Sequence, residues 1–169
     1  MDSGVTTRPA GLSAGLKKIH ALVLLAPIGI LSIIIVGLTG ATFESLFNSV
    51  LVTNDASPML MSYAGPAATL AIAAVISGAL YALGSTESWI KGASALSTAL
   101  ITWAFGLVAF GFACKQANIG NKSMFDSSSA DYGIRLPSDL KALSGLTIIL
   151  VLLETAYVLL LHLLLAASN

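Results

Sequence analysis

Residues 95–120 read ALSTALITWAFGLVAFGFACKQANIG, and the first charged side chain in this stretch is Lys115. About 20 predominantly apolar residues are enough for an α-helix to cross a bilayer. A soluble domain could not easily cover a helix that is apolar on every side. The stretch therefore predicts a membrane-spanning helix that ends with Cys114, Lys115 and Gln116 at the level of the lipid headgroups.

The composition of the whole chain agrees with this interpretation. Only 9% of the 169 residues are charged, whereas soluble domains contain about 25%. The chain is 56% hydrophobic and its mean hydropathy is +0.91, which together indicate an integral membrane protein. Eight basic and eight acidic residues give no net charge, so no nucleic-acid partner is expected. With Cys114 as its one cysteine, the chain forms no internal disulfide.

Three further apolar runs resemble the first one, and short polar segments separate them. The sequence predicts an all-α integral membrane protein, an antiparallel bundle of four transmembrane helices whose main partner is the lipid bilayer. The membrane domain covers residues 19–165, between a flexible N-terminal tail, 1–18, and a C-terminal tail, 166–169. The predicted spans are about 19–41, 63–84, 92–113 and 140–165. Loops are expected at 42–62 and at 114–138, the second of which is the longest polar loop. In the first loop, FESLFNSVLV, residues 43–52, could form a short amphipathic or interfacial helix.

Small residues recur on the second and third predicted spans. A spacing of four residues places them on one helix face, where they let the backbones of neighbouring helices approach closely in lipid. The residues expected to serve this packing are Ala67, Ala71, Ala74, Gly78, Ala82 and Gly106.

Glu154 is the one acidic residue in the middle of a predicted span, within TIILVLLETAYVLLLHL at 147–163. A carboxylate at that depth costs about 2.5 kcal/mol or more, and such residues usually face a bundle interior or a water-filled cavity. Tyr157, three residues on, shares the helix face of Glu154. His162 lies about 80° round the helix and is a neighbour at best.

Two roles for Glu154 stay open at this point. It could couple protons or bind a ligand in a transport path. It could instead be a protonated, structural side chain that is hydrogen-bonded to another span. The available partners are Thr98, Thr102, Ser77 and Tyr81.

Catalytic, cofactor and metal motifs are missing from the sequence. It contains no GxGxxG, no phosphate-binding loop, no HExxH and no cluster of Cys and His with metal-ligand spacing. We therefore expect no enzyme, no cofactor, no catalytic residues and no metal site.

The orientation is not decided by the count of basic residues. If the spans alternate, four basic residues lie on each side: Arg8, Lys17, Lys18 and Lys91 on one, and Lys115, Lys122, Arg135 and Lys141 on the other. The first span usually dominates, and the first loop carries no basic residue. We expect both termini to be cytoplasmic.

Two segments of the chain resemble the plant AWPM-19-like plasma-membrane proteins. One is WAFGLVAFGFACKQANIG, residues 103–120, which matches a GxACKxxxxG pattern from Gly111 to Gly120. The other is LKALSGLTIILVLLETAYVLLLH, residues 140–162, in which Tyr157 and His162 match a LxYxxxxH pattern. The resemblance covers roughly residues 60–165. The chain departs from the family at Ser144, where a Glu is common, and at Glu154, where a neutral polar residue is common. Glu154 therefore takes no role from the resemblance.

The resemblance implies a four-span plasma-membrane protein associated with abscisic acid, dehydration, cold and seed maturation. It also implies that the chain could carry abscisic acid or a similar small amphipathic acid, whose carboxylate Lys115 could pair with. Together with the residues singled out by their position in the last span, the candidate ligand or transport residues are Glu154, Lys115, Tyr157 and His162.

Two further functions stay open beside transport. The chain could be a structural tetraspan that stabilises membranes, or an accessory subunit of a larger membrane complex. Because four spans form a narrow bundle, transport would need a homo-oligomer or such a complex.

Overall fold

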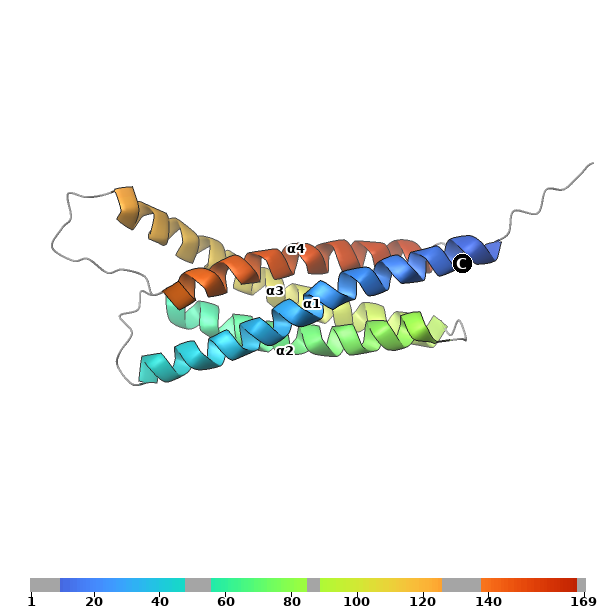
Figure 1. The fold of residues 1–169 in the computed structure, drawn as a ribbon, viewed down its shortest axis with the longest axis horizontal. Helices are drawn as coiled ribbons and strands as arrows, with labels where there is room; N and C mark the ends of the chain where they lie inside the picture. Colours follow the sequence, from blue (N-terminus) through green and yellow to red (C-terminus); the bar gives the residue numbers. More distant parts are fainter. Residues whose placement is uncertain (1–9, 48–55, 85–88, 126–137, 167–169) are drawn as a thin grey trace, which may run out of the picture.

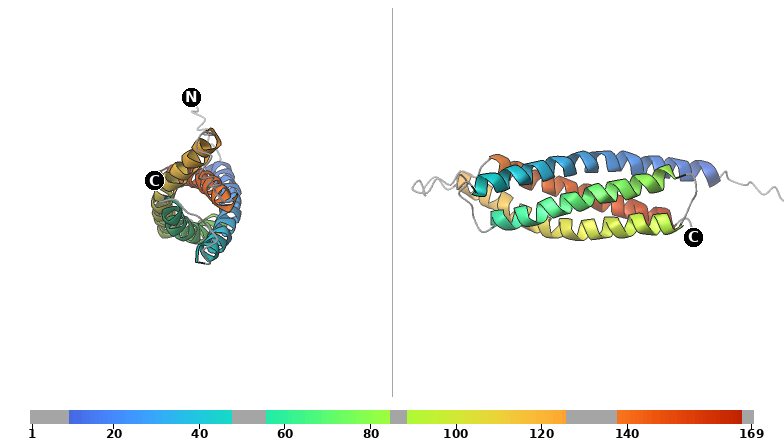
Figure 2. Two further views of the ribbon diagram at one scale, coloured as in Figure 1. Left: turned by 90° about the vertical axis from the view of Figure 1, so that its left-hand side faces the viewer. Right: turned by 90° about the horizontal axis from the view of Figure 1, so that it is seen from below.

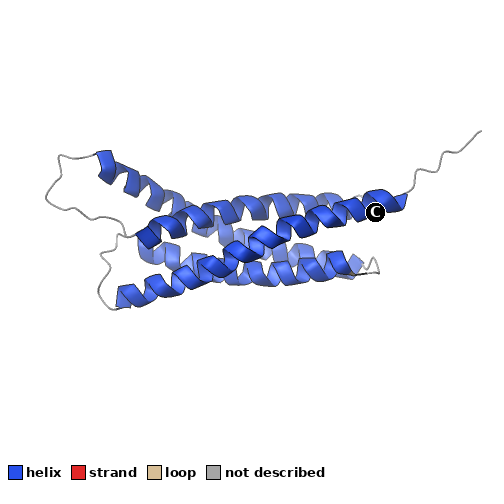
Figure 3. Ribbon diagram, viewed as in Figure 1, coloured by secondary structure: helices blue, strands red, loops and turns tan. Residues whose placement is uncertain are grey.

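Four long helices make up the described part of the chain. The computed structural model describes residues 10–47, 56–84, 89–125 and 138–166. The helices are α1 (Ala10–Phe47), α2 (Ala56–Leu83), α3 (Trp89–Phe125) and α4 (Ser138–Ala166) (Figure 1). No strand occurs in these residues (Figure 3), so the predicted all-α class is confirmed. The predictions for residues 1–9, 48–55, 85–88, 126–137 and 167–169 fall outside the described residues.

The four helices close into a ring. Each helix packs against the next one along the chain, and α4 packs back against α1 (Figure 2). The diagonal pair α2 and α4 touches only slightly. Because successive helices run in opposite directions, the start of α1 and the end of α4 lie at the same end of the bundle (Figure 1). We call this the termini end, and the opposite end, where α4 begins, the far end.

Each helix is long and apolar enough to cross a bilayer. The candidate spans are Ile19–Ser45, Ser57–Leu83, Gly92–Asn118 and Ser138–Ala166, all longer than the roughly 20 residues that a span requires. Large apolar side chains also cover the outside of the bundle, among them Ile33 on α1, Leu80 on α2 and Leu163 on α4. Such a surface is stable against lipid chains, so the bundle is that of an integral membrane protein.

The helices extend further than the sequence patterns predicted. α1 begins at Ala10, although residues 10–18 were expected to belong to a flexible tail. α1 also continues through Phe47, into the segment that was predicted to be a loop with a separate interfacial helix. α2 likewise begins at Ala56, inside the predicted loop 42–62. The reason is that the hydropathy pattern marks only the most apolar part of a helix, whereas the backbone can stay helical through the less apolar residues on either side.

The end of α3 is the clearest correction. The predicted span ended at residue 113 and a loop was expected from residue 114, but α3 runs on to Phe125. This last part of α3 diverges from the other helices (Figure 1). Gln116 was placed at the headgroups, yet its side chain is only 1% exposed, and its Oε1 lies 3.4 Å from the hydroxyl of Ser57 on α2.

Small residues fill much of the space between the helices. Of the six residues predicted to pack helices together, Ala82 is half-buried. The other five are buried: Ala67, Ala71, Ala74, Gly78 and Gly106. α3 contributes a matching set of buried alanines, Ala95, Ala99, Ala109 and Ala113. Without bulky side chains between them, the backbones of α2 and α3 can approach closely, which strengthens their dispersion contacts.

Two specific side-chain contacts join α3 to its neighbours. The indole N–H of Trp103 donates a 2.9 Å hydrogen bond to the hydroxyl of Thr155 on α4. The rings of Phe112 and Tyr63 on α2 are stacked, with centroids 5.8 Å apart. Both contacts hold α3 in one rotational setting relative to α2 and α4.

Replacing Thr155 with Val should weaken the α3–α4 contact. Valine keeps the shape but removes the acceptor of the Trp103 N–H, and interhelical hydrogen bonds in membrane proteins contribute about 0.6–1.7 kcal/mol. The free energy of unfolding, measured by circular dichroism in mixed dodecyl sulfate micelles, should fall by about that amount. The matched control is Thr69→Val, since the exposed Thr69 hydroxyl donates to the Gly65 carbonyl of its own helix. An equal loss in both variants would contradict the prediction.

Candidate functional site

Glu154 lies inside the bundle, near the middle of α4. Its side chain is 4% exposed, and its carboxyl group packs against the backbone of α3 at Gly106. A Cβ atom added at Gly106 would lie 2.9 Å from Glu154 Oε2 and 3.1 Å from Val151 Cγ2. The missing side chain of Gly106 therefore provides the room for the carboxyl group.

Tyr157 occupies the next turn of α4 and is 2% exposed. Its hydroxyl group lies against α2 at Gly78, where an added Cβ atom would overlap the hydroxyl oxygen. α4 thus directs two polar groups into the bundle, and glycines of two different helices receive them. The sequence had assigned Gly78 and Gly106 to general helix packing. The sequence does contain a signal for this more specific role: both positions carry glycine, where alanine would be enough to continue the pattern of small residues.

A small cavity opens beside the two polar groups. The space that it offers to the centre of a water molecule is about 10 Å³, close to the minimum for one buried water. All four helices contribute to its lining: Leu25 and Ile28 of α1, Ala74 and Val75 of α2, Ala99 and Thr102 of α3, and Glu154, Tyr157 and Val158 of α4.

Both carboxyl oxygens of Glu154 and the hydroxyl of Tyr157 are buried without a hydrogen-bond partner among the described residues. The four predicted partners of Glu154 do not bond to it. Three of their hydroxyls donate within their own helices: Thr98 to the Ser94 carbonyl, Thr102 to the Thr98 carbonyl and Ser77 to the Ala74 carbonyl. A Ser or Thr hydroxyl in a helix has such a carbonyl within reach at all times. Of the two roles left open for Glu154, the one that needs a direct hydrogen bond to another span is thus not borne out among the described residues.

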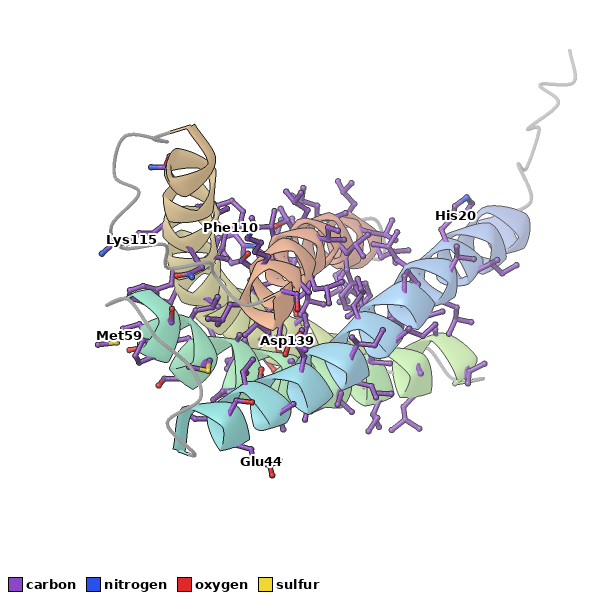
Figure 4. All side chains as sticks on the ribbon, turned by 60° about the vertical axis from the view of Figure 1, so that its left-hand side comes forward. His20, Glu44, Met59, Phe110, Lys115 and Asp139 are labelled. Atoms are coloured by element: carbon purple, nitrogen blue, oxygen red, sulfur yellow. The ribbon has the colours of Figure 1, made fainter. Side chains whose placement is uncertain are left out.

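Lys115 and His162 are not part of this site. Lys115 is exposed on α3, nine residues beyond Gly106, and its side chain points away from the bundle (Figure 4). His162 is exposed on α4, toward the termini end. Of the four candidate ligand residues, the structure brings together only Glu154 and Tyr157. No group of three potential metal ligands occurs in the described ranges.

Replacing Gly78 with Ala should destabilise the bundle, because the new methyl group would meet the Tyr157 hydroxyl. Overpacking of this kind costs about 1–3 kcal/mol, measurable as a lower free energy of unfolding in mixed micelles. Gly145→Ala on the exposed face of α4 is the matched control, since nothing lies within 4 Å of a Cβ there. Adding Tyr157→Phe to Gly78→Ala should restore part of the loss. A Gly78→Ala protein as stable as the control would refute the close contact.

The family comparison agrees with the resemblance found in the sequence. The model of the AWPM-19-like family matches residues 29–164, which run from the first half of α1 almost to the end of α4. No curated protein and no solved structure matches the chain. The family match covers most of the chain and contains every residue of the Glu154 site except Leu25 and Ile28. The chain therefore belongs to the AWPM-19-like family.

Proposed function

We propose that this protein facilitates the passage of a small amphipathic weak acid across the plasma membrane, with both termini in the cytoplasm. Abscisic acid is the candidate substrate that the family resemblance suggests. The proposal includes no enzymatic step and no cofactor. Its support comes from the site inside the bundle and from the family to which the chain belongs.

The observation that carries the proposal is the buried carboxyl group of Glu154. A structural role would require the carboxyl to bond to a neighbouring helix, and no described residue offers such a bond. An unpaired acid at this depth costs stability, and a leucine or methionine would fill the same space without that cost. A carboxyl group with no direct bond to another helix is better explained by a part in transport than by a part in holding the bundle together.

The size of the cavity limits how the acid can move. Pockets that enclose small organic ligands measure about 300–1,000 Å³, whereas this cavity offers about 10 Å³, close to the minimum for one water molecule. We therefore place the substrate path either between copies of the protein in a homo-oligomer or in a bundle whose helices have separated. Lys115 is a candidate contact for the acid's carboxylate at the membrane surface, outside the cavity.

A structural tetraspan or an accessory subunit of a membrane complex is the second candidate. The observation that favours it is the closely packed core of alanines around such a small cavity. Under this alternative the apolar outer surface would order lipid or contact another membrane protein, and no substrate would cross.

Uptake of labelled abscisic acid into proteoliposomes distinguishes the two candidates. The unmodified protein should take up more acid than empty liposomes do, and Glu154→Gln should reduce uptake to the level of empty liposomes. Gln keeps the shape of the side chain but cannot release a proton. Lys115→Ala should raise the acid concentration needed for half-maximal uptake and leave the maximal rate unchanged, because Lys115 lies outside the cavity.

The matched control is Glu44→Gln, which removes an exposed carboxyl group from α1 and should leave uptake unchanged. Size-exclusion chromatography in detergent establishes that each variant assembles as the unmodified protein does. Uptake by the unmodified protein no greater than that of empty liposomes would overturn the transport proposal for this acid.

A further inference from the structure

We propose that the cavity is a proton-binding site, in which Glu154 carries the proton, one water molecule joins its carboxyl group to Tyr157, and protons enter from the termini end. The site does not require the proposed transport, because a proton can bind to Glu154 whether or not an acid crosses the membrane.

The polar groups at the cavity match the needs of one water molecule. A buried water usually makes two to four hydrogen bonds. Glu154 offers two unpaired oxygens, Tyr157 offers an unpaired hydroxyl, and the Thr102 hydroxyl, which donates to the Thr98 carbonyl, keeps its lone pairs as acceptors. Three residues that line one cavity thus supply both acceptors and donors, while the rest of the lining is apolar.

The charges around the carboxyl group favour a proton as its ligand. α1 contributes Leu25 and Ile28 to the lining, and α3 contributes Ala99 and Thr102. From α2, Tyr81 is the titratable group near Tyr157. No lysine, arginine or histidine lines the cavity in the described chain. A metal cation such as Na⁺ would need more oxygen ligands than these side chains offer, since hard cations take about six or more. A proton needs only the carboxyl group itself.

The arrangement of tyrosines indicates the side from which protons enter. The Tyr157 hydroxyl lies against Gly78, and Tyr81 is three residues further along α2, on the same face and closer to the termini end. The Tyr81 ring is half-buried and packs over Gly92 at the start of α3, where an added Cβ would lie 3.2 Å from the ring. Two phenol groups therefore lie in sequence from the cavity toward the end of α2 and the start of α3.

Toward the far end, the residues next to the cavity are apolar. Ala109 and Leu150, one turn from Gly106 and Glu154 toward the far end, are 0% and 2% exposed. Beyond them the Thr147 hydroxyl donates to the Leu143 carbonyl of its own helix, so it is a poor donor to a water chain. Buried apolar side chains also follow toward the termini end, where Leu161 and Ala95 are both 0% exposed, so the Tyr81 phenol near Tyr157 is what favours proton exchange with the termini side over the far side.

Labelling with dicyclohexylcarbodiimide, which enters lipid, tests the site on the full-length protein. A protonated carboxylic acid adds its O–H across one C=N bond of the reagent to give an O-acylisourea, which rearranges to a stable N-acylurea. No group leaves, so the labelled peptide gains the mass of the whole reagent. The ionised carboxylate does not react in this way, and mass spectrometry therefore reports the protonated fraction of Glu154.

The pH is set separately on the two sides of sealed vesicles that contain the protein at low density. Vesicles with an N-terminal tag facing outward are then collected by affinity. Labelling of Glu154 should fall as the pH on the termini side rises and should not respond to the pH on the far side. The proposal would be overturned if the labelling of Glu154 changed with the pH on the far side, if it did not change with pH at all, or if Glu154 were not labelled at any pH. Loss of label when Na⁺ is added at constant pH would also overturn it, because the ligand would then be a cation.

Matched variants test the residue assignment and the entry route. Glu154→Gln should lose the label and Glu44→Gln should keep it. Tyr81→Phe should slow the response to a pH change several-fold, whereas Tyr63→Phe, which removes the hydroxyl of another half-buried tyrosine of α2, should not. Equal rates in the two tyrosine variants would refute entry past Tyr81. The main measurement is the labelling of Glu154 in the unmodified protein, without added substrate. A negative result for the proton site is therefore distinct from a negative result in the uptake experiment.

Discussion

The close approach of helix backbones is the constraint on which the rest of the structure depends. In lipid, apolar side chains gain little by leaving the bilayer for a protein interior, so helices associate through dispersion contacts at short range. Buried alanines on α2 and α3 allow this approach, and Gly78 and Gly106, which have no side chain, allow a still closer one. At Gly78 and Gly106 the backbone itself forms the wall against which the Tyr157 hydroxyl and the Glu154 carboxyl group lie.

This constraint also explains why the polar site is small. A ring of four closely packed helices has little space on its axis, and here that space accommodates one water molecule. To enclose an organic acid, the bundle would need larger side chains between neighbouring helices, which would hold the helices apart. Alternatively, it would need fewer side chains on its central axis. The closely packed bundle of one copy thus leaves no room on its axis for an organic acid.

The sequence predicted the four-helix fold and, among the four candidate ligand residues, the two that the structure brings together, Glu154 and Tyr157. Four apolar runs predict four spans, because a lipid environment requires backbone groups to bond within each helix. The same patterns predicted the ends of the helices poorly, since α3 continues through the polar residues that follow Lys115. The i, i+3 spacing placed Tyr157 beside Glu154. Glu154 forms no bond to Thr102 or Thr98, whose hydroxyls donate to carbonyls of their own helix, and spacing does not reveal how the helices are rotated against one another.

The sequence by itself determined that this chain is a four-span membrane protein of its family, that a carboxyl group lies at the centre of its last span, and that Tyr157 is on the same face. These properties follow from local periodicity and from the length of each apolar run. Only the tertiary structure decided that the carboxyl group has no bonded partner among the described residues, that glycines of two other helices make room for α4, and that Lys115 and His162 point elsewhere. Those facts depend on how each helix is rotated against its neighbours, and that rotation is set by packing among residues that are distant in the sequence.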